Sequence, residues 1–199
     1  MNSEMQITVP EGDDLTAEDV SSGAAASSNT EPVAHGTSVS DGLVIYRARH
    51  VDEIPNVRDI VCEFHAEGRF SHLPFSEEKF IRFYTKALSN PHNTFLIYIQ
   101  YKSKTIGVLH ACVGDYYLGI GGRMVTVYGI YVSAKVRGTY LGGKVGVKLL
   151  RLVSEWAKSQ DAEEIHIHST SGIEPERTNK MLTRMGFEAY GGNYGARLI

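Results

Sequence analysis

A glycine-rich turn between an apolar strand and a long amphipathic helix is the feature that most constrains this chain's fold. The turn spans residues 137–144 (RGTYLGGK), after a strand predicted over 123–132 and before a helix predicted over 143–159. A helix N-terminus presents unpaired N–H groups and the positive end of the helix dipole. Glycines before it let a ligand come close to the backbone. The turn therefore predicts an anion site, where Arg137 and Lys144 favour a phosphate group.

Two other interpretations of this turn have to be weighed. Gly138, Gly143 and Lys144 match the GxxxxGK pattern of a P-loop, but Val145 stands where Ser or Thr must bind magnesium. The later apolar strand over 165–168 does not end in an Asp that would assist the metal. Both observations are evidence against a nucleoside triphosphate site. A turn that only connects the strand to the helix stays open as an alternative.

Hydrophobic periodicity predicts alternating strands and helices from residue 42 to the C-terminal end. The predicted strands cover 43–48, 94–101, 105–113, 123–132 and 162–169, followed by closing strands over 187–190 and 194–198. The predicted helices cover 52–68, a segment from Ser76 to the Asn90-Pro91 stop, 143–159 and 174–184. Short loops between the middle strands favour antiparallel pairing. The order indicates an α+β domain whose mixed, mostly antiparallel sheet is flanked by helices.

Charge is unevenly distributed along the chain. Residues 1–42 hold eight of the 23 acidic residues and none of the 20 basic ones, so the remainder carries a net charge of +5. The segment 1–41 is also rich in Ser, Ala, Gly and Thr, a composition that buries too little apolar surface to offset its ordering entropy. We predict a disordered acidic tail over 1–41 and a folded domain over 42–199. The mildly basic domain suits an anionic small molecule.

Several classes of function lack the sequence features that they need. The whole chain has a net charge of −3, which gives no general signal for nucleic acid binding. Cys62 and Cys112 lie in apolar runs and are interpreted as buried thiols, and no zinc-site spacing is present, so no metal is expected. No apolar run approaches the roughly 20 residues of a membrane span. The N-terminus lacks the pattern of a signal peptide, so we expect a cytoplasmic protein.

Two motifs resemble the GNAT N-acetyltransferase family. Residues 128–144 (YGIYVSAKVRGTYLGGK) look like the family's strand and R-G-x-G-x-G turn, and residues 182–187 (LTRMGF) are similar to its Tyr-x-x-φ-Gly-Phe block, where φ is apolar. The order of elements from Gly42 to about Leu198 also resembles the whole acyl-CoA N-acyltransferase fold. Both motifs occur in the family's order and at the right separation, which makes them more specific together than either is alone.

The resemblance implies an enzyme that transfers an acetyl group from acetyl-CoA to a primary amine by direct attack in a ternary complex. The cofactor is expected between the strand ending at Val132 and the strand 165–168, which splay apart in the family. The acceptor is a small-molecule or protein amine, bound near loops 69–75 and 114–122, and a homodimer is one assembly considered. The expected cofactor-binding residues are Ile130, Tyr131, Val132, Arg137, Gly138, Tyr140, Leu141, Gly142, Gly143 and Lys144.

Three residues are candidates for proton transfer: His110, Tyr131 and His168. Histidine suits proton transfer near neutral pH. A solvated or hydrogen-bonded strand histidine is the alternative for both histidines, and a water-relayed base is another. By the parity of a regular strand, Tyr128 and Tyr131 are expected on opposite faces.

Two positions depart from the family's pattern. Tyr140 occupies the place of the first loop glycine, and Leu182 occupies the place of a tyrosine that protonates the departing thiolate in many members. Both departures favour the alternative hypothesis, a catalytically idle domain of this fold that binds coenzyme A or a protein partner.

Overall fold

The computed structural model describes residues 37–39 and 42–191. The expected disordered tail lies outside this part of the chain except at its end, where Thr37–Val39 forms strand β1 and pairs with the next strand. Regular structure thus begins before Gly42, the expected start of the folded domain. The closing strand expected over 194–198 lies outside the described residues.

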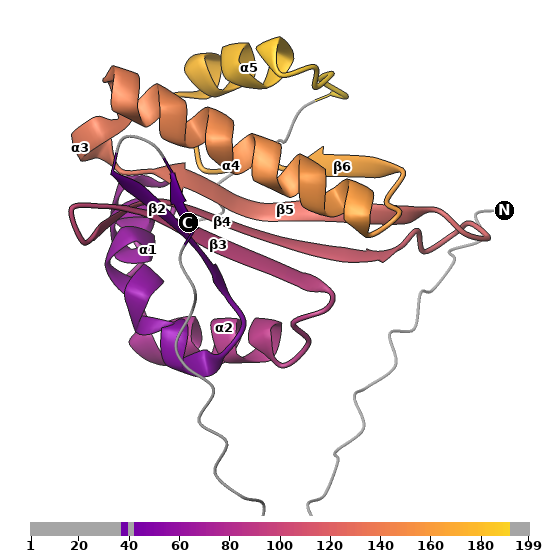
Figure 1. Ribbon diagram of the computed structural model, residues 1–199, viewed down its shortest axis with the longest axis horizontal. Helices are drawn as coiled ribbons and strands as arrows, with labels where there is room; N and C mark the ends of the chain where they lie inside the picture. Colours follow the sequence, from indigo (N-terminus) through magenta and orange to yellow (C-terminus); the bar gives the residue numbers. More distant parts are fainter. Residues whose placement is uncertain (1–36, 40–41, 192–199) are drawn as a thin grey trace, which may run out of the picture. The chain divides into compact units, whose positions relative to one another are not determined.

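A six-stranded sheet forms the centre of the fold, in the order β1-β2-β3-β4-β5-β6 (Figure 1). All neighbouring strands are antiparallel except β5 and β6, which are parallel. This arrangement confirms the mixed, mostly antiparallel sheet expected from the sequence. The remaining strands are β2 (Leu43–Ala48), β3 (Thr94–Tyr101), β4 (Lys104–Asp115), β5 (Arg123–Val132) and β6 (Glu164–Ile167).

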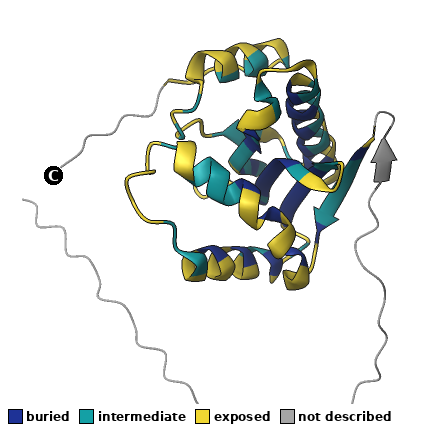
Figure 2. Cartoon of the chain, turned by 90° about the vertical axis from the view of Figure 1, so that its left-hand side faces the viewer, coloured by how far each residue is buried: buried dark blue, intermediate teal, exposed yellow. Residues whose placement is uncertain are grey.

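Helices cover both faces of the sheet (Figure 1). On one face α1 and α2 enclose a core that includes Ile60, Tyr84 and Leu96, and on the other α4 encloses a core that includes Leu149 and Phe95. Figure 2 shows the buried residues on the inner sides of these layers. The helical segments are η1 (Val51–Glu53), α1 (Pro55–Glu67), α2 (Glu77–Leu88), α3 (Ala134–Arg137), α4 (Tyr140–Ser159) and α5 (Pro175–Arg184).

Local capping sets the ends of these helices. Ser76 caps α2, because its side chain accepts a hydrogen bond from the Lys79 N–H at 3.3 Å. After α5, Gly186 adopts φ +88°, and the N–H of Phe187 returns to the Leu182 carbonyl at 3.1 Å. This is a Schellman ending, so the Gly-Phe pair has a structural reason to follow α5.

Two expectations about element bounds were wrong. The long helix begins at Tyr140, three residues before Gly143, because the side chain of Thr139 caps it by accepting from the Gly142 N–H at 3.3 Å. Residues 187–190 form no strand, and Tyr190 is 78% exposed. That segment finds no ladder partner in the described part of the chain.

Candidate functional site

Strands β5 and β6 pair over a short stretch and then diverge. Their parallel ladder joins Met124–Val127 of β5 to Glu164–Ile167. Just beyond it, the register of β4 and β5 shifts: His110 pairs with Gly129 and Ala111 with Val127, so Tyr128 is an extra residue in β5. Such a bulge bends the strand and increases its twist. In the described part of the chain, β5 from Tyr128 onwards therefore has a neighbouring strand on one side only.

The bulge also overturns the parity expected for two tyrosines. The Tyr128 ring stacks on His110 at 5.5 Å between centroids, and His110 contacts Tyr84 of α2 at 5.6 Å. Tyr131 packs against Phe64 of α1 at 5.3 Å. Both tyrosines therefore lie on the α1–α2 face, although they were expected on opposite faces, because the extra residue shifts the alternation by one position.

A cavity of about 520 Å³ lies where the two strands diverge. Its walls are the β5 segment 128–132, the chain that leaves β6 at 167–171, the first turns of α4, and α5. We call it the basic cavity. Its charged lining consists of the cations Arg137, Arg177, Lys180 and Arg184, together with the carboxylate Glu174.

The cations of α5 were not singled out from the sequence. Arg177, Lys180 and Arg184 stand three and four residues apart, a spacing that puts them on one face of a helix. That spacing is visible in the printed sequence. What the sequence did not reveal is that this face of α5 is turned toward the glycine-rich turn across the basic cavity.

The glycine-rich turn contributes to the basic cavity only in part. Gly142 and Gly143 line it, as do Ile130, Tyr131, Val132 and Arg137. The other four expected cofactor residues do not line it; they are Gly138, Tyr140, Leu141 and Lys144. Two of them point their side chains elsewhere, since Tyr140 is 89% exposed and Leu141 packs against the core beneath α4.

The two glycines at the start of α4 have different reasons to be glycine. A Cβ at Gly142 would overlap the backbone carbonyl of Val136, so that position is fixed by close packing of the chain. A Cβ at Gly143 would meet nothing within 4 Å. Gly143 therefore leaves open a space that a side chain would fill on the cavity wall.

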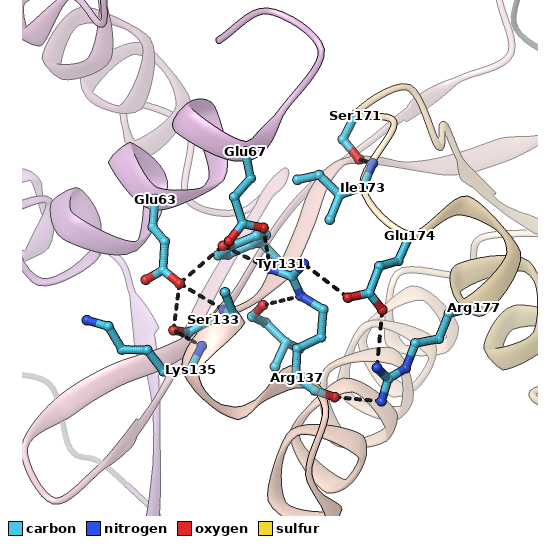
Figure 3. A network of polar contacts seen from close by, with 12 residues as sticks. Glu63, Glu67, Tyr131, Ser133, Lys135, Arg137, Ser171, Ile173, Glu174 and Arg177 are labelled. Carbon is cyan, nitrogen blue, oxygen red and sulfur yellow. Dashed lines mark hydrogen bonds and ion pairs between the residues drawn. The ribbon is translucent and has the colours of Figure 1, made fainter.

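Arg137 joins three parts of the fold beside the cavity (Figure 3). Its Nε donates to the Val132 carbonyl at 3.0 Å, and its Nη2 donates to Glu67 at 2.6 Å and to the Tyr131 hydroxyl at 3.0 Å. Its Nη1 lies 3.5 Å from Glu174, the residue that precedes α5. The guanidinium thus links β5, α1 and the start of α5.

Glu63 of α1 holds the end of β5 in place (Figure 3). Its Oε1 accepts from the Ser133 hydroxyl at 2.7 Å, the Ala134 N–H at 2.8 Å and the Tyr131 hydroxyl at 3.2 Å. Burial, and then the negative charge of Glu63, raise the pKa of Tyr131 above its ordinary value. The phenol keeps its proton and directs it to Glu63, so Tyr131 is suited to hold the strand.

A second cavity, of about 620 Å³, lies on the other side of the same β5 segment. It extends between the end of α1, α2, β4 and β5, and it shares Phe64 and the residues 128–131 with the basic cavity. We call it the apolar cavity. Leu73, Pro74 and Phe75 of the loop before α2 line it, whereas the loop at 114–122 does not.

His110 is buried at the apolar cavity, with 4% of its surface exposed. It lies between the rings of Phe83, Tyr84 and Tyr128. Desolvation in this setting lowers the pKa of His110 to about 4, so the imidazole is neutral at pH 7.

A chain of weak hydrogen bonds selects the tautomer of His110. The Thr94 hydroxyl donates its hydrogen to the Ala87 carbonyl at 2.7 Å. Thr94 Oγ1 therefore accepts from the Cys112 thiol, whose sulfur lies 3.8 Å away. Because the thiol hydrogen of Cys112 is donated to Thr94, the sulfur accepts a hydrogen bond from His110 Nε2 at 3.7 Å. Neutral His110 consequently carries its proton on Nε2 and has Nδ1 as its acceptor.

The three candidates for proton transfer do not converge on one point. His110 lines the apolar cavity and exposed His168 lines the basic cavity, while Tyr131 lines both. His166 lines neither and pairs with Glu164 at 2.8 Å. The candidates therefore stand on opposite sides of the β5 segment, with Tyr131 between them.

Two other kinds of site were sought in the described part of the chain. No cluster of three His, Cys, Asp or Glu side chains there is arranged to hold a metal ion. No helix there has the length and apolarity needed to cross a membrane.

Solved structures share this architecture. No protein-family model matches the chain, and no curated protein matches it in sequence. A transcriptional regulator from Bacillus halodurans superposes with a TM-score of 0.61 at 16% identity, covering 82% of this chain and all of that one. Glucosamine-6-phosphate N-acetyltransferase from Arabidopsis thaliana superposes with a TM-score of 0.56 at 13% identity, covering 79% of this chain and 99% of that one. An aminoglycoside 6'-N-acetyltransferase from Acinetobacter baumannii superposes with a TM-score of 0.57 at 15% identity, covering 79% of this chain and 99% of that one. At these identities the likeness establishes the fold.

Proposed function

We propose that this chain, whose fold is that of the GNAT acetyltransferases, transfers an acetyl group from acetyl-CoA to a primary amine. One observation carries the proposal: two cavities meet across the same segment of β5, residues 128–131, one lined by cations and the other by rings. An anionic donor and a separate acceptor would then reach the same strand from opposite sides. That arrangement suits direct attack in a ternary complex.

The basic cavity would hold the donor. Helix α4 directs its N-terminus toward the cavity, where first-turn N–H groups and the helix dipole favour a pyrophosphate. The N–H groups of Gly142 and Gly143 already donate to Thr139, so the proposed donors are the N–H groups of Tyr140 and Leu141. The side chains of these two residues point away from the cavity. The cations of α5 would face the same phosphates from the opposite wall.

The pantetheine arm would lie along the edge of β5. The Ser133 N–H donates to the Ile106 carbonyl of β4, so by alternation the backbone groups of Ile130 and Val132 are directed to the opposite side. The groups of Ile130 would bond a pantetheine amide as an added strand does, while the Val132 carbonyl accepts from Arg137. The Val132 N–H is the proposed donor to the oxyanion that forms on the thioester carbonyl.

Proton transfer in the proposed reaction uses both sides of β5. The amine nitrogen attacks the thioester carbon, the C–S bond breaks, and the nitrogen loses a proton. His110 accepts that proton at Nδ1 from the apolar cavity, and His168 supplies one to the thiolate from the basic cavity. Tyr131 is a positioning residue, and Leu182 takes no part.

A coenzyme A-binding domain without catalysis is the competing function. It is favoured by Leu182 in the place of the acid and by the exposed side chain of Tyr140. Two measurements on one sample separate the hypotheses: the thermal shift caused by acetyl-CoA, and thiol release with a panel of primary amines. Stabilisation with turnover supports the enzyme, and stabilisation without turnover supports the binding domain. No stabilisation would remove the donor assignment altogether.

Gly143→Asp tests the donor site directly. The new carboxylate would enter open space on the cavity wall and repel a pyrophosphate, so we expect the Kd for acetyl-CoA to rise by at least about tenfold. The domain should keep its Tm, because an acidic residue in the first turn of a helix interacts favourably with the dipole. Gly143→Ala is the steric control and should weaken binding far less. Equal affinities of wild type and Gly143→Asp would show that the turn has no ligand role.

A further inference from the structure

We infer that the acceptor is a small aromatic monoamine, with one primary amine on an apolar ring system, and that polycationic amines are excluded. The inference rests on the proposed function, because it assigns the apolar cavity to the amine that the acetyl group reaches. It follows from what lines that cavity and from what is absent there.

Rings form most of the wall of the apolar cavity. They come from α1, the loop before α2, α2 and β5, so they surround the space from several directions. Six of them are Phe64, Phe75, Phe80, Phe83, Tyr84 and Tyr128. A volume of about 620 Å³ falls in the range of sites for small ligands.

No Asp or Glu of the described residues lines the apolar cavity. The α1 carboxylates of Glu63 and Glu67 lie close to β5, but they accept hydrogen bonds from Ser133 and Arg137. The lining does include Lys79, an exposed cation. The cavity therefore offers a polyamine no counter-ions and one like charge.

This charge pattern discriminates between classes of amine. A single ammonium is accommodated over aromatic faces through cation–π attraction. Each further ammonium of a polyamine or aminoglycoside would lose its hydration without gaining a partner. Removal from water also favours the neutral amine, which is the form that attacks the thioester. The same wall thus binds the substrate and prepares its nucleophile.

The test compares kcat/KM for 2-phenylethylamine, ethylamine, spermidine and kanamycin with acetyl-CoA as donor. We expect 2-phenylethylamine to exceed spermidine and kanamycin by at least about a hundredfold, and to exceed ethylamine by at least about tenfold. If the kcat/KM for spermidine, kanamycin or ethylamine equals that for 2-phenylethylamine, the acceptor inference is wrong while the proposed acetyltransferase function stands. If no amine is acetylated, the proposed function fails and takes the inference with it.

A matched pair of variants on α2 tests the cavity itself. Phe83 and Ile81 are both 48% exposed, but only Phe83 lines the apolar cavity. Phe83→Glu should lower kcat/KM for 2-phenylethylamine by at least about tenfold and raise it for spermidine, because it supplies the missing counter-ion. Ile81→Glu should leave both values within about twofold. The same response from both variants would overturn the assignment of this cavity to the acceptor.

Discussion

Burial separates residues that look alike in the sequence. His110 and His168 both stand in predicted strands, and both were candidates for proton transfer. In the fold, rings enclose His110, while His168 is exposed. Burial therefore lowers the pKa of His110, and a buried chain of partners sets its tautomer. The distinction arises from what packs against each strand.

The buried histidine should make stability depend on pH. The pKa of His110 is about 4 in the folded chain and 6.5 ordinarily, so between these values the unfolded chain binds a proton that the folded chain does not. Stability should therefore fall as the pH falls from 6.5 toward 4, by about 2 kcal/mol between pH 7 and pH 5. Urea denaturation at the two pH values measures it.

His110→Phe should lose this part of the pH dependence, because phenylalanine does not titrate. His92→Phe, at an exposed position before β3, is the matched control and should keep it. A wild-type-like pH dependence in His110→Phe would show that other groups cause the effect.

At the scale of elements, α5 is a helix whose N-terminal end is held to Arg137 by a hydrogen bond and an ion pair. None of its residues is buried, and Arg177 donates to the Arg137 carbonyl at 2.7 Å. Met181 approaches α4, since its sulfur lies 3.1 Å from where a Cβ at Gly146 would stand. An element with so little buried surface contributes little to the core. Its value lies in the cations that it presents to the basic cavity.

Charge reversal on α5 should weaken the binding of acetyl-CoA while changing the stability of the fold little. We expect the double variant Lys180→Glu, Arg184→Glu to raise the Kd for acetyl-CoA by at least about tenfold at low salt. The Tm without ligand should change little, because both side chains lie outside the core. Lys158→Glu on α4, exposed and outside the basic cavity, is the control. If Lys158→Glu weakens binding as much as the double variant does, the effect comes from general charge and not from the cavity wall.

At the scale of the whole molecule, one carboxylate ties the α1–α2 layer to the strand that both cavities share. Glu63 collects three hydrogen bonds from the end of β5 and the start of α3. Tyr131 and Ser133, which donate two of them, are buried. The fold therefore fixes the β5 segment through a layer that is separate from the glycine-rich turn.

Glu63→Ala should destabilise the domain by about 3 kcal/mol, because it leaves buried hydroxyl donors unsatisfied. Asp59→Ala, whose side chain on α1 is 96% exposed in a surface ion pair, should cost less than about 0.5 kcal/mol. Denaturation midpoints of the two variants provide the comparison. Equal losses of stability in the two variants would mean that the hydrogen bonds of Glu63 contribute little to the stability of the domain.

The sequence by itself determined the elements and their class. It predicted the bounds of β2, β3 and β5 to the residue, because alternation and turn residues within a few positions specify a strand. It also indicated the sheet class and the resemblance that the solved structures confirm at the level of fold. These features depend on neighbours along the chain.

Only the tertiary structure decided what the site contains. The bulge at Tyr128 exists because β5 has one residue more than β4 between paired positions, so the face of that tyrosine depends on the partner strand. Arg137 was expected at a phosphate, yet its guanidinium meets Glu67 and Glu174, far from it in sequence. The basic wall of α5 likewise becomes a site only across a cavity. Periodicity records which side a residue faces, but long-range packing decides what stands opposite.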